Sequence, residues 1–170
     1  DSALTGLSER LQPGDISELS QSSDVAFRVT FDGDKPSRNE LYWRAMTLDE
    51  HDGDGWDKSV LDAAQLPMPA LTDEAAYRYE VIQEPTGQAY LFSLAGSASR
   101  DADIELTATR LLRYERPVYQ RIRYDATAPV NPIIGPAFDS ERRAAPDLYL
   151  ALPDGVNPMI REWAVQQPAE

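Results

Sequence analysis

The sequence contains no cysteine and only one histidine, His51. Without cysteine the chain can form no disulfide, and it supplies neither a thiolate nucleophile nor a sulfur ligand for a metal. An imidazole base would have to be His51, and no serine lies in a Gly-x-Ser-x-Gly turn. These absences exclude a thiol enzyme and leave a serine hydrolase with little support.

Basic side chains and long apolar runs are also scarce. Sixteen Lys and Arg residues stand against 29 Asp and Glu, which gives a formal net charge of -13. This acidity argues against nucleic acid and against an anionic membrane surface, because both attract positive side chains. No run of about 18 apolar residues is present. The sequence begins at Asp1 without Met and without a signal-peptide pattern, so we expect a cut-out or processed product of a longer protein.

What the sequence does contain is alternation of apolar and polar residues with a period of two, which is typical of half-buried strands. No amphipathic helix separates the alternating segments, so parallel βαβ units are not expected. We predict an all-β fold, an antiparallel β-sandwich (Ig-like or barrel-like) of about 6–8 strands with a short C-terminal helix. The alternating segments are residues 25–31, 41–45, 77–81, 88–94, 104–113 and 118–124.

The expected organisation is an arm over residues 1–23, a β-sandwich over 24–153 and a short helix or linker over 154–170. For the final helix, Asn157 is the expected N-cap and Pro158 the first helical residue.

A hairpin is predicted over residues 41–56, where alternation gives way to an acidic turn containing two glycines. His51 lies in the predicted tip between two acidic residues, where a solvated imidazole is a better interpretation than a catalytic base. Asp49, Asp52, Asp54 and Asp57 are candidate calcium ligands, because hard oxygen atoms on a glycine-rich turn suit that ion. The alternative is a plain Asp-Gly hairpin turn without a metal. We favour the turn and expect neither a metal nor a cofactor.

Aromatic and arginine residues supply the candidate interaction surfaces. Trp43 and Trp56 either belong to a platform that stacks on a sugar or anchor the core. Arg121 and Arg123 belong to a basic cluster, with Arg110, Arg113 and Arg116, that could dock an acidic partner. Pairing of these arginines with nearby carboxylates is the alternative.

Several motifs occur in an order that resembles a known family. Together they are similar to the extracytoplasmic segment of TgpA-like bacterial membrane proteins of the transglutaminase-like superfamily, in the part that precedes the catalytic core. The motifs are Pro13-Gly14-Asp15-Ile16-Ser17-Glu18-Leu19, Val25-Ala26-Phe27-Arg28-Val29, Leu41-Tyr42-Trp43-Arg44, Asp52-Gly53-Asp54-Gly55-Trp56, Leu150-Ala151-Leu152-Pro153 and Val156-Asn157-Pro158.

The resemblance implies a location outside the cytoplasm, in a parent protein that is anchored in the membrane. The Cys, His and Asp of the family's papain-like core would all lie after Glu170, so no catalytic residue is carried over to this chain. The expected function is a non-catalytic accessory domain that positions or regulates that downstream core. The expected partners are the core and the flanking membrane helices of the same parent, and no nucleic acid is expected.

Two alternatives to this function remain. One is a β-sandwich binding module that recognises a glycan or protein through surface aromatic residues. The other is an adhesion-type domain stabilised by calcium at the acidic turn.

Overall fold

The computed structural model describes residues 7–13, 24–58, 64–70, 76–130, 153 and 155–166. In these ranges the chain forms eleven strands, one 3-10 helix and one α-helix, and every strand pairs antiparallel. The bounds are β1 Arg10–Leu11, β2 Phe27–Asp32, η1 Arg38–Glu40, β3 Trp43–Arg44, β4 Leu48–His51, β5 Trp56–Lys58, β6 Gln65–Leu66, β7 Ala76–Gln83, β8 Ser93–Leu94, β9 Ile104–Thr107, β10 Leu112–Tyr114, β11 Ile122–Pro129 and α4 Pro158–Val165. The predicted antiparallel all-β fold with a short C-terminal helix is confirmed. The strands outnumber the expected six to eight because several contain only two or three residues.

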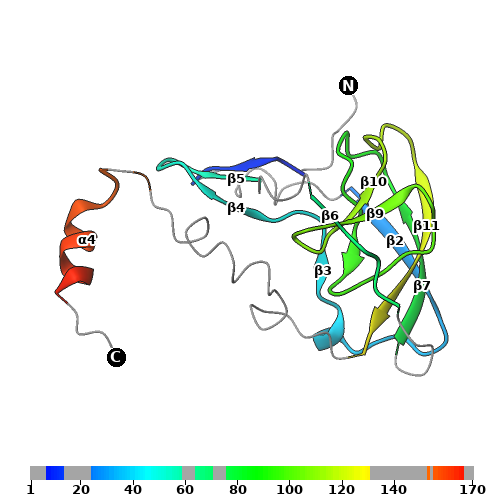
Figure 1. The fold of residues 1–170 in the computed structure, drawn as a ribbon. Coiled ribbons are helices and arrows are strands. Elements are labelled where there is room, and N and C mark those ends of the chain that lie inside the picture. The colour runs from blue at the N-terminus through cyan, green and yellow to red at the C-terminus, as the bar shows by residue number, and fades with distance from the viewer. Residues whose placement is uncertain are drawn as a thin grey trace.

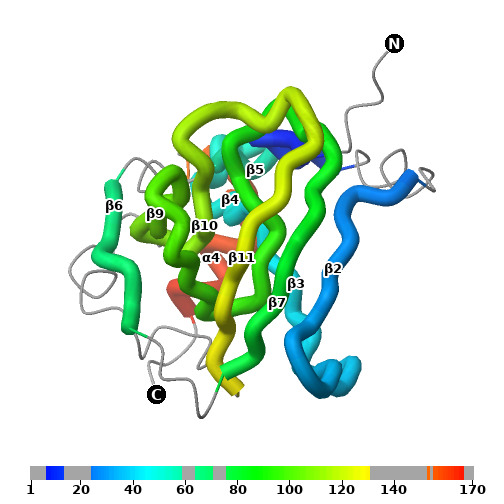
Figure 2. The backbone as a smooth tube through the Cα atoms, turned by 90° about the vertical axis from the view of Figure 1, so that its right-hand side faces the viewer, coloured from blue at the N-terminus to red at the C-terminus, as the bar shows by residue number. Residues whose placement is uncertain are grey.

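The largest sheet has the strand order β11-β7-β2, with β7 in the centre (Figures 1 and 2). Tyr79, Val81 and Gln83 of β7 are buried, whereas Arg78 is exposed. Because side chains alternate between the two faces of a strand, Tyr79 and Val81 enter the same core. Val29 of β2 lies opposite Val81, which continues the apolar face across the sheet.

A second sheet, with the order β10-β9-β6, closes the other side of the core (Figure 2). Ile104 and Leu106 of β9 and Leu112 of β10 belong to the same buried cluster as Tyr79 and Val81 of β7. Each fully buried aliphatic side chain contributes about 1.5–3 kcal/mol relative to exposure, so this two-layer cluster is the main source of stability.

Polar side chains on the buried face of the large sheet hold the segment that precedes β8. Gln83 donates from Nε2 to the Tyr90 carbonyl at 3.1 Å, and its Oε1 accepts from the Phe92 amide at 3.1 Å. The Tyr124 hydroxyl also lies 3.1 Å from that Oε1, and it donates to the Phe92 carbonyl at 2.7 Å. The segment thus bonds on one side to these side chains, while on the other side the Leu91 amide donates to the Leu112 carbonyl of β10 at 3.0 Å.

Burial also affects the acid–base properties of two phenols in this region. Burial raises the pKa of Tyr79 to about 12 and raises the pKa of Tyr124 as well. The Tyr79 hydroxyl lies 2.6 Å from the Ser97 hydroxyl and accepts from the Leu94 amide at 2.9 Å. Both phenols are therefore neutral structural groups near neutral pH.

A third sheet, with the order β1-β5-β4, extends from the body as a hairpin with β1 along its edge (Figure 1). Arg10 of β1 lies opposite Asp57 of β5, and Leu11 lies opposite Trp56. The predicted hairpin turn is confirmed, but its first strand is 48–51 and not the predicted segment 41–45, and its second strand is 56–58. Of the N-terminal arm, only residues 7–13 are described, and there the chain includes the strand β1.

Two predicted strands differ from the structure. The segment 104–113 is a hairpin, not one strand, because the chain reverses through Arg110 with φ at 60°. The Thr107 hydroxyl accepts from the Leu111 amide at 3.1 Å, which closes a turn that contains neither glycine nor proline. In the segment 118–124 the strand begins only at Ile122, and Val118 is buried in the preceding loop.

The predicted strand over 88–94 is only partly present. The regular pairing is limited to Ser93–Leu94 and to an isolated bridge between Tyr90 and Arg113. The Tyr90 carbonyl and the Phe92 amide bond to the Gln83 side chain and are not available to a neighbouring strand. β8 pairs with β3, the strand of the 41–45 segment, in a separate two-stranded sheet.

The helix predicted at the C-terminal end is present as α4 and begins at Pro158. Asn157 is its N-cap, but it has φ at 49° and its side chain makes no capping hydrogen bond, so the predicted role of that side chain is wrong. The Asn157 carbonyl instead accepts from the amides of Ile160 and Arg161 at 3.1 Å. No helix in the described part of the chain is long and apolar enough to cross a membrane.

Candidate functional site

The tip of the β4–β5 hairpin is organised by Asp52. One carboxylate oxygen of Asp52 accepts from the amide of Asp54 at 3.0 Å and from that of Gly55 at 2.9 Å. Gly53 has φ at 110°, a conformation that side chains disfavour, so glycine fits here for a steric reason. The acidic turn is therefore built as a hydrogen-bonded loop of the kind that aspartate commonly closes.

Arg10 of β1 joins the tip to the strand that follows it. Its guanidinium lies 2.6 Å from the Asp52 carboxylate and 2.7 Å from that of Asp57. The hydrogen bond from Arg10, helped by the two backbone amides, lowers the pKa of Asp52 to about 2. Next to it, Lys58 pairs with Glu9 at 2.7 Å, so β1 is held to β5 by charge as well as by backbone pairing.

The calcium candidates do not assemble into a ligand set. Asp52 and Asp57 share a guanidinium, and Asp54 is exposed at the turn. In the part of the chain that the structure describes, which includes Asp49, no three acidic or histidine residues are grouped as they would be around a metal ion.

His51 lies at the end of β4 rather than in the turn and is half-buried, so the predicted solvated imidazole is wrong. Its ring centroid is 4.8 Å from that of Trp56. Nδ1 is buried, and no described residue forms a hydrogen bond with it. A general base needs a partner that orients the ring and a nucleophile within reach, and the described residues supply neither to this nitrogen.

The two tryptophans of the hairpin region have different environments. Trp43 packs against the core with its ring at 5.0 Å from Phe27 and 5.6 Å from Tyr79. Trp56 is 44% exposed, so the prediction that it anchors the core is wrong. The β1-β5-β4 sheet lies outside the core, and the Trp56 ring packs against His51 rather than against core residues. Of the two, Trp56 is the more exposed and the better placed to stack on a ligand, and the interaction role of both stays a prediction.

Four arginines of the predicted basic cluster, Arg113, Arg116, Arg121 and Arg123, are paired with carboxylates. Arg121 donates to Glu84 at 3.0 Å, and Arg123 donates to Glu80 at 3.1 Å. The bond from Arg121 is the main reason that the pKa of Glu84 is lowered. Such exposed pairs contribute only about 0–1 kcal/mol each, so they do not prevent docking of a partner. The partner-binding role of these two arginines stays a prediction.

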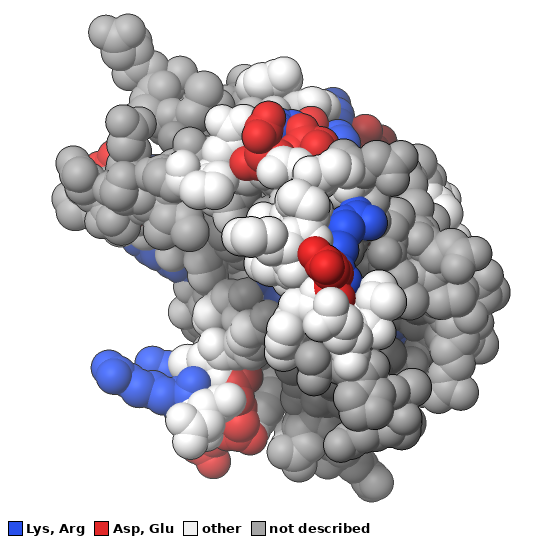
Figure 3. Space-filling view, turned by 90° about the vertical axis from the view of Figure 1, so that its left-hand side faces the viewer, with Lys and Arg blue, Asp and Glu red and all other residues white. Residues whose placement is uncertain are grey.

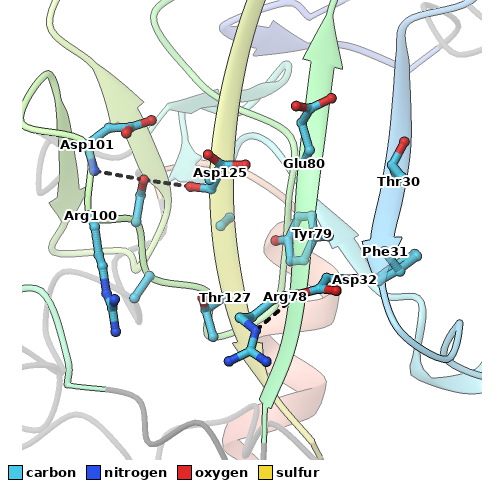
Figure 4. A pocket seen from close by; sticks show the side chains of 13 residues that line it. Thr30, Phe31, Asp32, Arg78, Tyr79, Glu80, Arg100, Asp101, Asp125 and Thr127 are labelled. Atoms are coloured by element: carbon cyan, nitrogen blue, oxygen red, sulfur yellow. Dashed lines mark hydrogen bonds and ion pairs between the residues drawn. The ribbon is translucent and has the colours of Figure 1, made fainter.

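A groove of about 640 Å³ crosses the solvent face of the β11-β7-β2 sheet (Figure 4). Its floor is formed by β2, β7 and β11, and its wall is the segment 98–101. The Ser99 hydroxyl donates to the Asp125 carbonyl at 2.7 Å and accepts from the Asp101 amide at 3.3 Å, which fixes that wall. The polar side chains of its lining are those of Thr30, Asp32, Arg78, Glu80, Ser99, Arg100, Asp101, Asp125 and Thr127.

The chemistry of this groove favours binding over catalysis. Its lining carries four carboxylates, two guanidinium groups and three hydroxyls but no histidine. Arg78 and Asp32 face each other at 3.4 Å, and the Ser99 hydroxyl is already committed to the backbone. The groove can therefore hold a polar or cationic ligand by hydrogen bonds, but it presents no activated nucleophile.

Sequence reasoning missed the groove and the role of Arg10. Arg10 and Asp57 are 47 positions apart, and no local pattern connects them. Gln83 was detectable in principle, because it occupies an inward position of an alternating strand, where a polar side chain must find backbone partners.

Comparison with known proteins gives a consistent result. The sequence model of the TgpA N-terminal domain matches residues 1–133. A curated relative, the protein-glutamine gamma-glutamyltransferase of Pseudomonas aeruginosa strain PAO1, is 34% identical over 161 residues, which cover 95% of this chain and 24% of the relative.

Two solved structures are also similar. The crystal structure of the periplasmic domain of TgpA from Pseudomonas aeruginosa superposes with a TM-score of 0.75 at 35% identity, over 94% of this chain and 55% of that one. The same domain bound to ethylmercury gives a TM-score of 0.64 at 32% identity, over 98% of this chain and 52% of that one. The chain thus spans about a quarter of the curated relative and about half of each solved periplasmic domain. It belongs to the TgpA N-terminal domain family.

Proposed function

We propose that this chain is a non-catalytic accessory domain of a membrane-anchored transglutaminase-like protein, located outside the cytoplasm, which positions or regulates a downstream Cys-His-Asp core. The support for location is the likeness to a periplasmic domain. The support for the parent's chemistry is the likeness to a protein-glutamine gamma-glutamyltransferase.

One observation carries the proposal, namely that the chain has no cysteine. Acyl transfer through a covalent thioester requires a thiolate, and this chain cannot supply one. Its one imidazole, that of His51, packs against Trp56 and has no oriented partner at Nδ1 among the described residues. In such a parent the reaction belongs to another segment, and the task of this domain is structural.

The test is a transfer assay that follows incorporation of a fluorescent primary amine into a glutamine-containing protein. We expect no incorporation by this chain alone and measurable incorporation by the parental segment that also contains the residues after Glu170. His51→Ala should leave both results unchanged. Turnover by this chain alone that disappears in His51→Ala would refute the proposal.

A second candidate function, a binding module, is favoured by the groove of about 640 Å³ and by the exposure of Trp56. Cell-wall glycan fragments are the probe, and tryptophan fluorescence is the readout. A saturable shift that disappears in Trp56→Ala while the fold persists would support recognition through the hairpin. A shift that disappears instead in Asp125→Asn would support the groove, and no saturable shift would remove this candidate.

A further inference from the structure

The β2 margin of the largest sheet is open in the part of the chain that the structure describes. β2 lies at one end of the strand order β11-β7-β2, and Figure 2 shows no described strand beyond it. The other margin is covered, because Thr127 of β11 and Ala98 exchange backbone hydrogen bonds at 2.8 Å in both directions. An open strand margin presents backbone donors and acceptors with which another strand can pair.

The pairing of β2 with β7 determines which backbone groups face outward. The Glu84 amide donates to the Ala26 carbonyl at 3.0 Å, and backbone groups alternate in direction along an antiparallel strand. Every second residue after Ala26 therefore bonds to β7. The residues between them, Phe27, Val29 and Phe31, direct N–H and C=O away from β7, and no described residue forms a hydrogen bond with these groups.

β2 lacks two features that commonly keep a strand margin from pairing. Its six residues contain no proline, and their register with β7 runs without a bulge. The side chains of Phe27, Val29 and Phe31 pack against the core but are only half-buried. An added strand would therefore form backbone hydrogen bonds and also cover apolar side chains that β7 leaves partly exposed.

The charges of β2 indicate which strand suits it. Arg28 and Asp32 lie two residues before and two residues after Thr30 on the solvent face, and their side chains are 57% and 76% exposed. In an antiparallel copy centred on Thr30, Arg28 of each copy lies opposite Asp32 of the other, and the two Thr30 side chains face each other. A register centred on Val29 would place Arg28 opposite Thr30 and lose both charge pairs. A parallel copy in register would oppose like charges.

We propose that the open margin of β2 is a self-association surface, at which two copies of this domain pair antiparallel about a two-fold axis at Thr30. In this arrangement Val29 of each copy exchanges backbone hydrogen bonds with Phe31 of the other, and the two large sheets become one continuous sheet. Such an interface is isologous, because the same strand serves both copies. The inference goes beyond the proposed function and does not depend on the chemistry of a parent protein.

Two effects oppose this association and limit its strength. Arg28 already pairs with Glu84 at 3.0 Å and Asp32 with Arg78 at 3.4 Å, but such exposed pairs are weak, and a guanidinium or a carboxylate can bond to two partners. The net charge of -13 makes two copies repel each other, and salt of about 0.15 M screens that repulsion beyond about 8 Å. The contacts across β2 are shorter than this distance, so they persist in salt.

The opposite side of the molecule has a different arrangement of charge. Figure 3 shows the side away from that of Figure 2, and the described Asp, Glu, Lys and Arg side chains there form small separate groups. In β2 the two opposite charges lie along one open strand margin at equal sequence distances from Thr30. This order makes β2 complementary to its own copy, which favours a second copy over an unrelated peptide as the partner.

The test is sedimentation equilibrium of this chain in about 0.15 M salt. Arg28→Asp would place Asp opposite Asp in both pairs, and Asp32→Arg would place Arg opposite Arg. Each change should therefore weaken association at least about tenfold. An equimolar mixture of the two single variants should form heterodimers, because each then supplies the charge that the other lacks. Arg116→Asp is the matched control, since it makes the same reversal on an exposed side chain outside β2 and should leave association unchanged.

The double variant Arg28→Asp with Asp32→Arg keeps opposite charges in both pairs and should associate as strongly as the wild type. Circular dichroism checks that each variant keeps its fold, and the double variant decides the question where a single variant does not. A wild type that stays monomeric up to about 1 mM would overturn the inference. Association that persists in both single variants, or that is lost in the double variant, would overturn it as well.

Hydrogen exchange identifies the strand margin that is used. The Val29 and Phe31 amides should exchange more slowly as protein concentration rises, whereas the Thr30 amide, which bonds to β7, should stay unchanged. Association without this protection would overturn the placement at β2. Protection of the same amides at every concentration, in a parental segment that continues past Glu170, would overturn the inference in favour of a downstream strand.

Discussion

Replacement of Gln83 with Met should destabilise the domain by removing the hydrogen bonds that hold the segment before β8. The change keeps the side-chain length, so the cavity cost stays small. It leaves the Phe92 amide without its acceptor and takes a donor from the Tyr90 carbonyl. Gln83 is 0% exposed, so water cannot replace either bond without a rearrangement.

The magnitude follows from these two bonds. A buried amide without a partner costs about 1–3 kcal/mol, and the lost bond to the carbonyl adds about 1 kcal/mol. Burial of the less polar methionine side chain offsets a fraction of this cost. We therefore expect the free energy of unfolding to fall by about 2–3 kcal/mol. Because single domains are stable by about 5–15 kcal/mol, this loss is a large share of the total.

Urea denaturation is the assay, with the free energy of unfolding obtained at an unchanged slope against urea. Gln120→Met makes the same chemical change at an exposed position and should stay within about 0.5 kcal/mol of the wild type. The effects of Tyr124→Phe and Gln83→Met on the free energy of unfolding should not be additive, since the Tyr124 hydroxyl is in hydrogen-bond contact with Oε1 of Gln83. A loss below about 1 kcal/mol for Gln83→Met would refute the reasoning.

Three further outcomes follow from the hairpin and the core. Gly55→Ala would place a Cβ 2.7 Å from the Leu11 carbonyl oxygen, so β1 should detach and its amides should exchange with solvent much faster. Asp52→Asn should destabilise the domain above about pH 4, and this difference should shrink as pH falls toward 2, because the unfolded carboxyl, with a higher pKa, is protonated first. Trp43→Ala should cost about 3–5 kcal/mol in urea denaturation, because its ring packs on the core.

Each of these three predictions has a control variant or an outcome that would contradict it. Unchanged exchange of the β1 amides in Gly55→Ala would show that the close approach of the two segments is wrong. Asp54→Asn removes the same charge from the turn and should not reproduce the pH-dependent effect of Asp52→Asn. Trp56→Ala should cost much less than Trp43→Ala, and an equal cost would contradict the exposed position of Trp56.

The strands that the sequence predicts best are those with one buried and one solvated face. β2 alternates strictly over its six residues and β7 over residues 77–81, and the structure pairs Val29 with Val81 on the buried side. The segment 104–113 fails because the alternation over residues 104–109 is followed by a reversal at Arg110, a residue type that gives no turn signal. Alternation reports which side of a strand is apolar, but it does not report where the strand ends.

The candidate site was less predictable, because its contacts are distant in sequence. The acidic turn was correctly read as a hairpin, since Asp-Gly pairs favour positive φ. Trp43 enters the core and Trp56 does not, because their strands join different sheets. The residues next to each tryptophan in the sequence do not determine which sheet its strand joins. The strands predicted over residues 25–31 and 77–81 form part of the floor of the groove, but only the folded chain brings residues 125–127 and the segment 98–101 beside them.

The hairpin also has a mechanical consequence. β1, near the start of the described chain, pairs with β5, and Val156, just before α4, touches the hairpin tip at Gly53. A tension applied between residues 7 and 166 therefore loads the hairpin first and bypasses the β11-β7-β2 core. Until β1 peels from β5 or Val156 leaves Gly53, the central sheets carry none of that tension. The hairpin thus connects the two ends of the described chain through the pairing of β1 with β5 and the contact of Val156 with Gly53.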